Sequence, residues 1–580
     1  MKTGFTTITF RKKTIDENIE IAKKANVYGI EWGGDVHVLP GDVQTAASVA
    51  LKMKKNNLTT LSYGSYYKTE YETADGFIPV IESARILGAP IIRVWAGSMG
   101  PAKADEEQFN KVVRNAQAIA DEAAKFGITV AFEYHRNTLT ENVESAMKLL
   151  KAIDRPNFQT YWQPNPDITI EDNCRELDII KDYVVTIHAF YWTPKRALMR
   201  EGMEVWKKYL NVVKGREDIN IVLEFCLDDA DESFLSDLDA IRELVLPKSI
   251  FCVSEREQSI TNAYDEKTKA EMRQLTYITD EVYTEAKFEA DPDCAKGVKY
   301  LFSTWGMPRF TEEQIKRYLP DLECVFYGAG SVQGFARPFM NLGIKVFSAW
   351  GANGVPVAEV SLAQILLANK GFFNAQRYSK RGDRQGASIA NHKYPGNYNC
   401  KVGIIGAGMI GSLVCEMLKK FDVEVLVFDP FASDEKLEAL GAKRATLEEL
   451  FSQCQTISNH LANNPQTVGM LNYDLFSKML PSATFINTGR GAQVVEADLV
   501  RALQEEPDRF AILDVTLPEP PVEGHEFYSL PNVVLTPHLA GSFNNEVARM
   551  GKFMCDEFLA YEKGEATKYE VSMKMLETMA

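Results

Sequence analysis

Short apolar runs alternate with amphipathic stretches along the first half of the chain. The runs are rich in β-branched and aromatic residues, as buried strands are, whereas the stretches between them repeat apolar residues at helical spacing. Strands are expected at residues 3–10, 29–32, 59–63, 91–95, 128–133, 158–162, 184–188 and 221–225. Helices are expected between them, for example over 106–126 and 142–153. Eight β/α units in about 250 residues predict a (β/α)8 barrel over residues 1–248.

A second α/β pattern begins at Ser249. Its apolar runs are SIFCVSERE, YLFSTWGMP, ECVFYGAGS and IKVFSAWG, and a long helix is expected from about 356 to 380. A polar stretch then leads into a third region, and the late amphipathic segment NEVARMGKFMCDEFLAYEKG is expected to return to the middle domain. The chain is therefore predicted to be α/β throughout, with a second domain formed by 249–395 plus 543–580 and a third by 396–542.

The third region opens with the glycine turn GIIGAGMIG. Gly406 would turn the chain, Gly408 would let the backbone approach a pyrophosphate, and Gly411 would permit close helix packing. The pyrophosphate would lie at the helix N-terminus, beside Met409 and Ile410. The next strand ends at Asp429, a carboxylate that would bind a ribose diol and repel a 2′-phosphate. A Rossmann domain with doubly wound parallel strands that binds NAD is therefore predicted.

Three motifs follow the glycine turn: INTGRGAQVV, LDVTLPEP and LTPHLAG. The order and the residues of these motifs resemble those of the D-isomer-specific 2-hydroxyacid dehydrogenases, and the resemblance covers roughly the second half of the chain. The resemblance implies that Arg490 holds the substrate carboxylate and polarises the ketone, and that His538 donates the proton in reduction and accepts it in oxidation. It also implies that Glu519 pairs with His538 and raises its pKa.

The same resemblance implies further contacts. Asp514 would contact the nicotinamide carboxamide, and Thr488 and His538 would also lie at the cofactor. The loop YGAGSV would hold the substrate carboxylate with the backbone amides of Ala329, Gly330 and Ser331, where small residues suit close approach. His460 lies in HLANNPQT, where relatives have an HxPLT segment, so this loop departs from the family pattern.

Polar residues end four late strands of the predicted barrel, where barrel enzymes place their chemistry. The segments VAFEYH, TYWQPN, VTIHAF and IVLEFC present Glu133, Gln163, His188 and Glu224. Oxygen and nitrogen ligands of this kind suit Mn2+ or Mg2+. The arrangement resembles the xylose-isomerase-like barrels, which include sugar isomerases, ketose 3-epimerases and inosose dehydratases. In epimerase-type relatives the second ligand is an aspartate. Gln163 in its place removes one negative charge and is expected to weaken metal binding.

That second resemblance implies that Glu133 and Glu224 exchange protons with the carbon next to a metal-polarised carbonyl. His37 and Arg93 are candidate substrate contacts at the barrel mouth, and Glu31, Trp95 and His135 are further mouth candidates. Four aromatic residues at strand ends either stack on a sugar ring or pack in the core: Tyr161, Trp162, Tyr191 and Trp192.

The amino-acid composition restricts the classes of molecule that the protein is expected to bind. The 580 residues carry 80 acidic and 64 basic side chains, and the net charge of −16 repels nucleic acid and anionic membranes. The nine cysteines include no CxxC pair, which favours reduced thiols and a cytoplasmic location. No uninterrupted apolar run approaches eighteen residues, so no membrane segment is expected.

The sequence thus predicts a fusion of an NAD-dependent oxidoreductase, acting on a small 2-hydroxy acid or 2-oxo acid, with a metal-dependent sugar isomerase or epimerase-like barrel. One pairing is isomerisation around hydroxypyruvate followed by its reduction to glycerate. The alternative is a dehydrogenase whose barrel is a non-catalytic sugar-binding module, which the substitution at Gln163 would explain. Small-molecule substrates and a homodimer formed through the nucleotide domain are expected.

Overall fold

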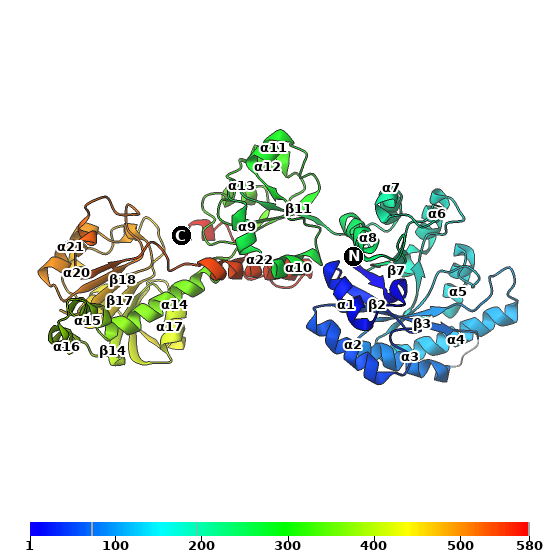
Figure 1. Ribbon diagram of the computed structural model, residues 1–580, viewed down its shortest axis with the longest axis horizontal. Helices are drawn as coiled ribbons and strands as arrows, with labels where there is room; N and C mark the ends of the chain where they lie inside the picture. Colours follow the sequence, from blue (N-terminus) through cyan, green and yellow to red (C-terminus); the bar gives the residue numbers. More distant parts are fainter. Residues whose placement is uncertain (71–73, 194, 578–580) are drawn as a thin grey trace. The chain divides into compact units, whose positions relative to one another are not determined.

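The structure is a computed structural model that describes residues 1–70, 74–193 and 195–577. The chain divides into two compact units (Figure 1). The first comprises Met1–Ser249 and Lys269–Thr279, and the second Ile250–Thr268 and Asp280–Ala580. The three predicted domain boundaries stay a prediction.

Eight parallel strands close into a barrel in the first unit (Figure 1, blue through cyan). Closure is made by β1 and β8, with Lys2 opposite Asn220. The predicted barrel is confirmed, and the strands are β1 (Lys2–Thr6), β2 (Gly29–Gly33), β3 (Thr59–Lys68), β4 (Ile91–Trp95), β5 (Thr129–Phe132), β6 (Phe158–Trp162), β7 (Val184–Ala189) and β8 (Asn220–Leu223).

Amphipathic helices follow the barrel strands. The helix α4, for example, buries Val112, Ala116 and Ile119 and begins with a capping box between Asp105 and Gln108. The main helices are α1 (Ile15–Lys24), α2 (Val43–Lys55), α3 (Ala74–Leu87), α4 (Glu106–Ala124), α5 (Val143–Ile153), α6 (Ile170–Ile180), α7 (Met203–Val212) and α8 (Asp231–Val245). Their apolar faces form one continuous core with the outward faces of the strands.

The second unit contains a five-stranded parallel sheet in the order β10-β9-β11-β12-β13. Its strands are β9 (Lys248–Cys252), β10 (Val282–Tyr283), β11 (Val298–Ser303), β12 (Cys324–Tyr327) and β13 (Lys345–Ser348). Its short helices are α9 (Gln258–Ala263), α11 (Glu285–Ala290), α12 (Glu312–Tyr318) and α13 (Ala336–Asn341). The late helix α22 (Val547–Glu562) returns to this sheet, where Phe558 contacts the rings of Tyr300, Phe302 and Phe326.

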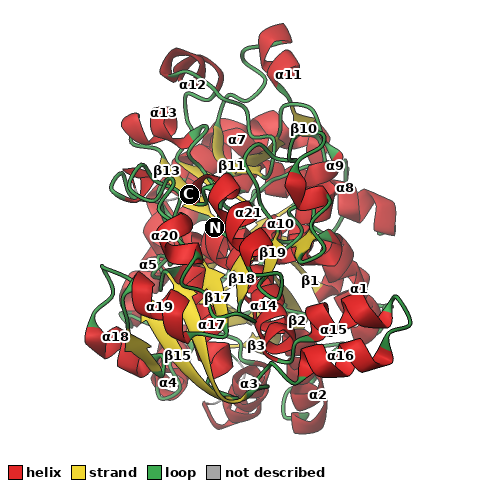
Figure 2. Cartoon of the chain, turned by 90° about the vertical axis from the view of Figure 1, so that its left-hand side faces the viewer, coloured by secondary structure: helices red, strands yellow, loops and turns green. Residues whose placement is uncertain are grey.

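The second unit also contains a seven-stranded parallel sheet in the order β16-β15-β14-β17-β18-β19-β20 (Figure 2, strands in yellow). Its strands are β14 (Tyr398–Ile405), β15 (Asp422–Phe428), β16 (Ala442–Arg444), β17 (Thr456–Asn459), β18 (Thr484–Asn487), β19 (Phe510–Leu513) and β20 (Val533–Leu535). Its helices are α17 (Met409–Leu418), α18 (Asp434–Ala439), α19 (Leu447–Gln453), α20 (Tyr473–Phe476) and α21 (Glu496–Glu505). The strand order reverses between β14 and β17, which is where doubly wound sheets bind ligands.

The prediction of a single long helix from 356 to 380 is wrong in detail. The structure has α14 (Trp350–Asn369) and α15 (Phe372–Ser379), and a third helix, α16 (Arg384–Asn391), lies within the polar stretch that leads into the third region. Gly371 separates the first two helices at φ 67°, a left-handed conformation that glycine adopts without strain and that ends a helix.

Among the described residues, α14 is the one helix whose length and apolar composition would suffice to cross a membrane. Half of its apolar window is buried inside the structure. Residues of α14 contact α17, β17 and β18 of the seven-stranded sheet, so its apolar surface has protein neighbours.

Candidate functional site

Three predicted metal ligands meet at one end of the barrel. Glu133 directly follows β5, His188 lies in β7, and Glu224 directly follows β8. All three side chains are buried, and one ligand atom from each lies within 4.8 Å of the others. The parallel strands deliver them to the same end because that is where barrel strands converge on the site.

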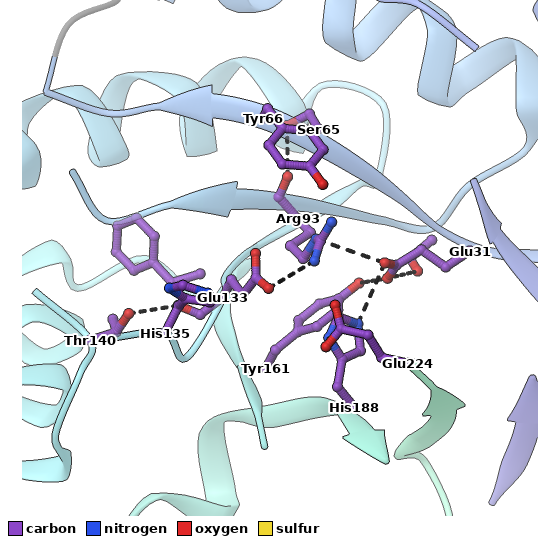
Figure 3. A network of polar contacts seen from close by, with 12 residues as sticks. Glu31, Ser65, Tyr66, Arg93, Glu133, His135, Thr140, Tyr161, His188 and Glu224 are labelled. Carbon is purple, nitrogen blue, oxygen red and sulfur yellow. Dashed lines mark hydrogen bonds and ion pairs between the residues drawn. The ribbon is translucent and has the colours of Figure 1, made fainter. Parts of the chain in front are cut away.

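A third carboxylate, Glu31 of β2, joins this cluster and connects it to Arg93 of β4 (Figure 3). Glu31 Oε1 lies 3.4 Å from His188 Nε2 and 3.8 Å from Arg93 Nε. Arg93 Nη1 in turn lies 2.9 Å from Glu133 Oε1, and His188 Nδ1 lies 3.1 Å from Glu224 Oε2. Buried charges persist only when they are paired, and here each charge has an opposite neighbour.

Burial and charge shift the pKa values of this cluster in opposite directions. Burial alone would raise the pKa of Glu31, but the charges of Arg93 and His188 hold it below its usual value. Burial would lower the pKa of His188, and the carboxylates of Glu224 and Glu31 reverse this and raise it to about 10. Burial raises the pKa of Glu133 despite the nearby Arg93. Glu133 is therefore the carboxyl of the cluster that binds a proton most readily.

The donor set fits a hard divalent cation. Glu133 Oε2 and Gln163 Oε1 are buried oxygen atoms without a hydrogen-bond partner. Together with His188 and Glu224 they supply the oxygen and nitrogen ligands that Mn2+ and Mg2+ accept. A cation there would need His188 in its neutral form, so metal binding would release a proton.

Three members of the cluster, Arg93, Glu133 and Glu224, line a cavity of about 280 Å³. Gln163 lines this cavity, as do Arg93, Trp95, His135 and Trp192. His37 is not among the described residues that line the cavity, and its Nε2 lies 2.9 Å from the carbonyl oxygen of Lys13. The structure therefore brings Arg93 to the cavity but not His37.

The aromatic candidates separate into different roles. Tyr161 Oη donates to Glu31 Oε2 at 2.9 Å, which helps to fix the position of this carboxylate. Trp162 is fully buried against Tyr209, and Tyr191 packs beside Gly202. Core packing thus accounts for Trp162, whereas Trp192 lines the cavity.

Ser62 of β3 is a site residue that sequence reasoning missed. Its Oγ donates to Glu31 Oε2 at 2.7 Å. Its position in a strand next to β2 was readable from the sequence, but the carboxylate that it contacts was not.

The glycine turn of the second unit has the expected geometry. Gly406 directly follows β14 at φ 90°, and a Cβ there would lie 2.9 Å from the carbonyl oxygen of His460. A Cβ on Gly411 would lie 1.9 Å from the carbonyl oxygen of Gly406, whereas a Cβ on Gly408 would meet nothing within 4 Å. The turn is therefore tight at Gly406 and Gly411, and Gly408 faces open space at the start of α17.

Asp429 follows β15 and braces this turn. Its Oδ2 accepts a hydrogen bond from the Ala407 amide at 2.7 Å, and its Oδ1 accepts from the amides of Phe431 and Ala432. Lys436 donates from Nζ to the Ala407 carbonyl oxygen at 2.6 Å, a contact that sequence reasoning missed. Met409 and Ile410 begin α17, and their side chains lie beside Gly354.

The predicted pair of Glu519 and His538 forms. His538 Nδ1 lies 2.7 Å from Glu519 Oε1, and the two side chains are 47% and 42% exposed. Asp514 accepts hydrogen bonds from Thr536 Oγ1 and from the amides of Leu539 and Ala540. The carboxylate predicted to contact nicotinamide therefore also fixes the loop that carries His538.

Arg490 follows β18 and is partly buried. Its Nη1 donates to the carbonyl oxygen of Gly489 at 2.8 Å. Within the described ranges it forms no ion pair, and no hydrogen bond joins it to His538 or Glu519. Thr488 Oγ1 lies 3.4 Å from Nδ1 of His460, whose pKa burial lowers to about 4.

The loop expected to hold a carboxylate follows β12. Ser348 Oγ donates to the carbonyl oxygens of Ala329 and Gly330 at 3.0 and 2.6 Å. The Ala329 amide donates to the carbonyl oxygen of Tyr327. This one of the three predicted amides therefore already has an acceptor within the loop. The amides of Gly330 and Ser331 form no hydrogen bond among the described residues.

Both halves of the chain match known families. Residues 362–540 match the sequence model described as D-isomer specific 2-hydroxyacid dehydrogenase, NAD binding domain. Residues 19–244 match the xylose isomerase-like TIM barrel. The chain carries a domain of each family. Both resemblances drawn from the motifs are thereby confirmed.

Individual relatives cover the dehydrogenase part. A D-3-phosphoglycerate dehydrogenase of Archaeoglobus fulgidus is 30% identical over 40% of this chain and 44% of its own length. A Bacillus subtilis protein named as a 2-hydroxyacid dehydrogenase is 34% identical over 39% of this chain and 65% of its own length. This chain therefore spans less than two thirds of each relative. A solved phosphoglycerate oxidoreductase of Rhizobium etli is 21% identical, with a TM-score of 0.49 over 57% of this chain and 99% of that chain.

Proposed function

We propose that the dehydrogenase half is an NAD-dependent oxidoreductase that interconverts a small 2-hydroxy acid and its 2-oxo acid. The observation that carries the proposal is the hydrogen bond between His538 Nδ1 and Glu519, formed in the unit that also holds a glycine turn of the NAD-binding type. A carboxylate at Nδ1 leaves Nε2 of the imidazole to exchange a proton with the substrate.

Arg490, His538 and Asp429 have different roles in this reaction. Arg490, which has no carboxylate partner among the described residues, binds the substrate carboxylate and polarises the ketone. His538 gives its proton to the oxygen of the ketone in reduction and takes it from the hydroxyl in oxidation. Bound NAD supplies or accepts the hydride, so hydride and proton together balance the reaction. Asp429 favours NAD over NADP because its charge repels a 2′-phosphate.

The test is NADH consumption by the full chain with a panel of 2-oxo acids, including hydroxypyruvate and 3-phosphohydroxypyruvate. The second compound is included because the curated relatives are named for phosphoglycerate. We expect turnover with at least one acid and a loss of about 10²–10⁴-fold in His538→Ala. His392→Ala, an exposed histidine outside the site, is the matched control. Absence of turnover with every acid would refute the proposal.

For the barrel we propose a metal-dependent sugar isomerase or epimerase. Glu133, Gln163, His188 and Glu224 would hold the cation, which when bound polarises a substrate carbonyl. Glu133 and Glu224 then move protons at the neighbouring carbon. The raised pKa of Glu133 suits a group that must bind and release a proton.

A sugar-binding module without catalysis is the second candidate, favoured by the neutral amide at Gln163. Metal analysis of the full chain separates the two. One equivalent of Mn2+ or Mg2+ that is lost in His188→Ala, with turnover of a sugar, supports the enzyme. A metal-free chain that still binds sugar supports the module.

We also propose that the protein acts in the cytoplasm as a homodimer on small molecules, without nucleic acid or membrane partners. The acidic net charge and the reduced cysteines support this assignment. Light scattering during gel filtration tests the oligomeric state, and a mass of about 65 kDa, that of one chain, would contradict the dimer.

A further inference from the structure

The carboxylate of Glu496 contacts the chain on both sides of Glu519. Glu496 is the first residue of α21, and its Oε1 accepts a hydrogen bond from the Leu517 amide at 2.8 Å. Its Oε2 lies 3.4 Å from Nε2 of His525, and the side chains of Glu496 and His525 are only 13% and 16% exposed. Leu517 precedes Glu519 in the chain and His525 follows it. One carboxylate therefore holds the loop of Glu519 at two points.

The ring of His525 is oriented as a donor toward Glu496. Its Nδ1 accepts a hydrogen bond from the Phe527 amide at 3.2 Å, so the ring hydrogen of the neutral imidazole lies on Nε2, which is the atom beside Glu496. Burial raises the pKa of Glu496, and the Leu517 amide and His525 act against this shift. A partly buried carboxylate is stable where such donors replace water, so each oxygen of Glu496 has its own partner.

Few other polar contacts hold this loop. Within the part of the chain that the structure describes, hydrogen bonds and ion pairs join residues 515–525 to two residues outside 514–528, which are Glu496 and His538. The other hydrogen bonds of the loop lie within 514–528. The side chain of Glu519 is 42% exposed, so packing alone does not fix it. Its position against His538 therefore depends on the contacts of Glu496.

Glu496 also belongs to the segment that follows Arg490. The chain passes from Arg490 through the short helix η4 (Gly491–Gln493) to Glu496. A Cβ on Gly491 would lie 2.1 Å from the carbonyl carbon of Thr516, so this segment and the loop are in direct contact. Glu496 thus connects the segment after the arginine motif to the loop whose carboxylate orients the imidazole.

We propose that Glu496 is a positioning residue of the dehydrogenase half, which holds the loop of Glu519 so that this carboxylate stays against His538. The inference rests on the oxidoreductase function proposed above. Glu496 acts through Glu519 rather than on the substrate, because without its two contacts the loop is free to move and the imidazole loses its partner. Displacing a catalytic group by about 1 Å can lower the rate by about a hundredfold.

The kinetic test is a double-mutant cycle between Glu496→Ala and Glu519→Gln, with NADH and a 2-oxo acid that the full chain reduces. Alone, Glu496→Ala is expected to lower kcat by about tenfold to a hundredfold, while KM and the Kd for NADH change by less than about threefold. In the Glu519→Gln background it is expected to lower kcat by less than about twofold, because the group through which it acts is already lost. Equal effects in both backgrounds, or an unchanged kcat, would overturn the inference.

Asp498→Ala is the matched control. Asp498 lies in the same first turn of α21 and accepts a hydrogen bond from the Tyr473 amide at 3.0 Å, in a segment without predicted site residues. Its replacement is expected to lower stability to urea as much as Glu496→Ala does, and to leave kcat within about twofold. An equal loss of kcat in both variants would assign the effect to stability and overturn the inference. If Glu496→Ala does not fold, Glu496→Gln replaces it in the cycle, with a smaller loss of kcat expected because its Oε1 can still accept from the Leu517 amide.

Hydrogen exchange of the full chain gives a measurement that does not need turnover. Glu496→Ala is expected to speed exchange of the Leu517 amide by about tenfold or more, and Asp498→Ala that of the Tyr473 amide, each without effect on the other. Unchanged exchange of Leu517 in Glu496→Ala overturns this inference alone, whatever the wild type reduces. Absence of wild-type turnover refutes the proposed function, and faster exchange of Leu517 would then still support Glu496 as the anchor of the loop.

Discussion

Glu519 and His538 share a hydrogen bond of 2.7 Å between Oε1 and Nδ1, and Asp514 holds the loop that carries His538. The carboxylate fixes which ring nitrogen carries the proton and so directs Nε2 away from Glu519. The loop of His538 is anchored independently by the two amide hydrogen bonds to Asp514. Glu519 therefore orients the imidazole, whereas Asp514 positions the loop that carries it.

Replacing Glu519 tests the first of these roles. Glu519→Gln is expected to lower kcat for the 2-oxo acid by roughly tenfold to a thousandfold, because the imidazole loses its charged partner. The Kd for NADH, measured by fluorescence, is expected to stay within twofold of the wild type. Glu523→Gln, an exposed neighbour, serves as control. An unchanged kcat would show that the hydrogen bond has no catalytic role.

Two glycines of the cofactor turn give a matched pair. Gly411→Ala places a Cβ 1.9 Å from the Gly406 carbonyl oxygen, so we expect destabilisation by about 2 kcal/mol or more. Gly408→Ala meets no atom within 4 Å, so stability should change by less than about 1 kcal/mol while NADH affinity falls at least tenfold. Urea unfolding and NADH titration measure the two effects. Normal NADH binding in Gly408→Ala would place the pyrophosphate elsewhere.

Arg93 is the counter-charge of two buried carboxylates in the barrel. Arg93→Met leaves Glu31 and Glu133 without it, and a loss of about 3–5 kcal/mol in the free energy of unfolding is expected. Arg155→Met removes an exposed pair with Asp121 and should lower the free energy of unfolding far less, because water screens that pair. Denaturant unfolding compares the variants. Equal losses would contradict the assignment of Arg93 as an internal counter-ion.

His460 predicts a pH dependence in the dehydrogenase half. Burial lowers its folded-state pKa to about 4, so the unfolded chain binds the proton more readily below pH 6.5. The stabilisation is present in full above pH 6.5 and is lost as the pH falls toward 4, by up to about 3 kcal/mol. His460→Gln should lack this contribution. Thermal unfolding at steps from pH 7.5 to 5 should show the wild type losing stability relative to His460→Gln, and parallel curves would refute the prediction.

Much of the architecture follows from local patterns. Alternation of apolar runs with helical periods predicted the eight barrel strands, because each buried strand needs a continuous apolar stretch whatever its neighbours are. The glycine turn was predictable for a similar reason, since Gly406 at φ 90° and Gly411 beside a carbonyl oxygen each need a residue without a side chain. The helix break at Gly371 was missed because the sequence does not specify the φ angle of a glycine inside a helical pattern.

The sequence by itself determined which residues have the chemistry: Glu133, His188 and Glu224 at strand ends, and the motif residues Arg490, Glu519 and His538. The tertiary structure decided their partners. That Arg93 neutralises Glu133, that Glu31 lies against His188, and that Asp514 holds the loop of His538 all depend on distances between residues far apart in the chain. Local propensity and motif spacing carry no information on such distances, because they are set by strand register and loop closure in the folded molecule.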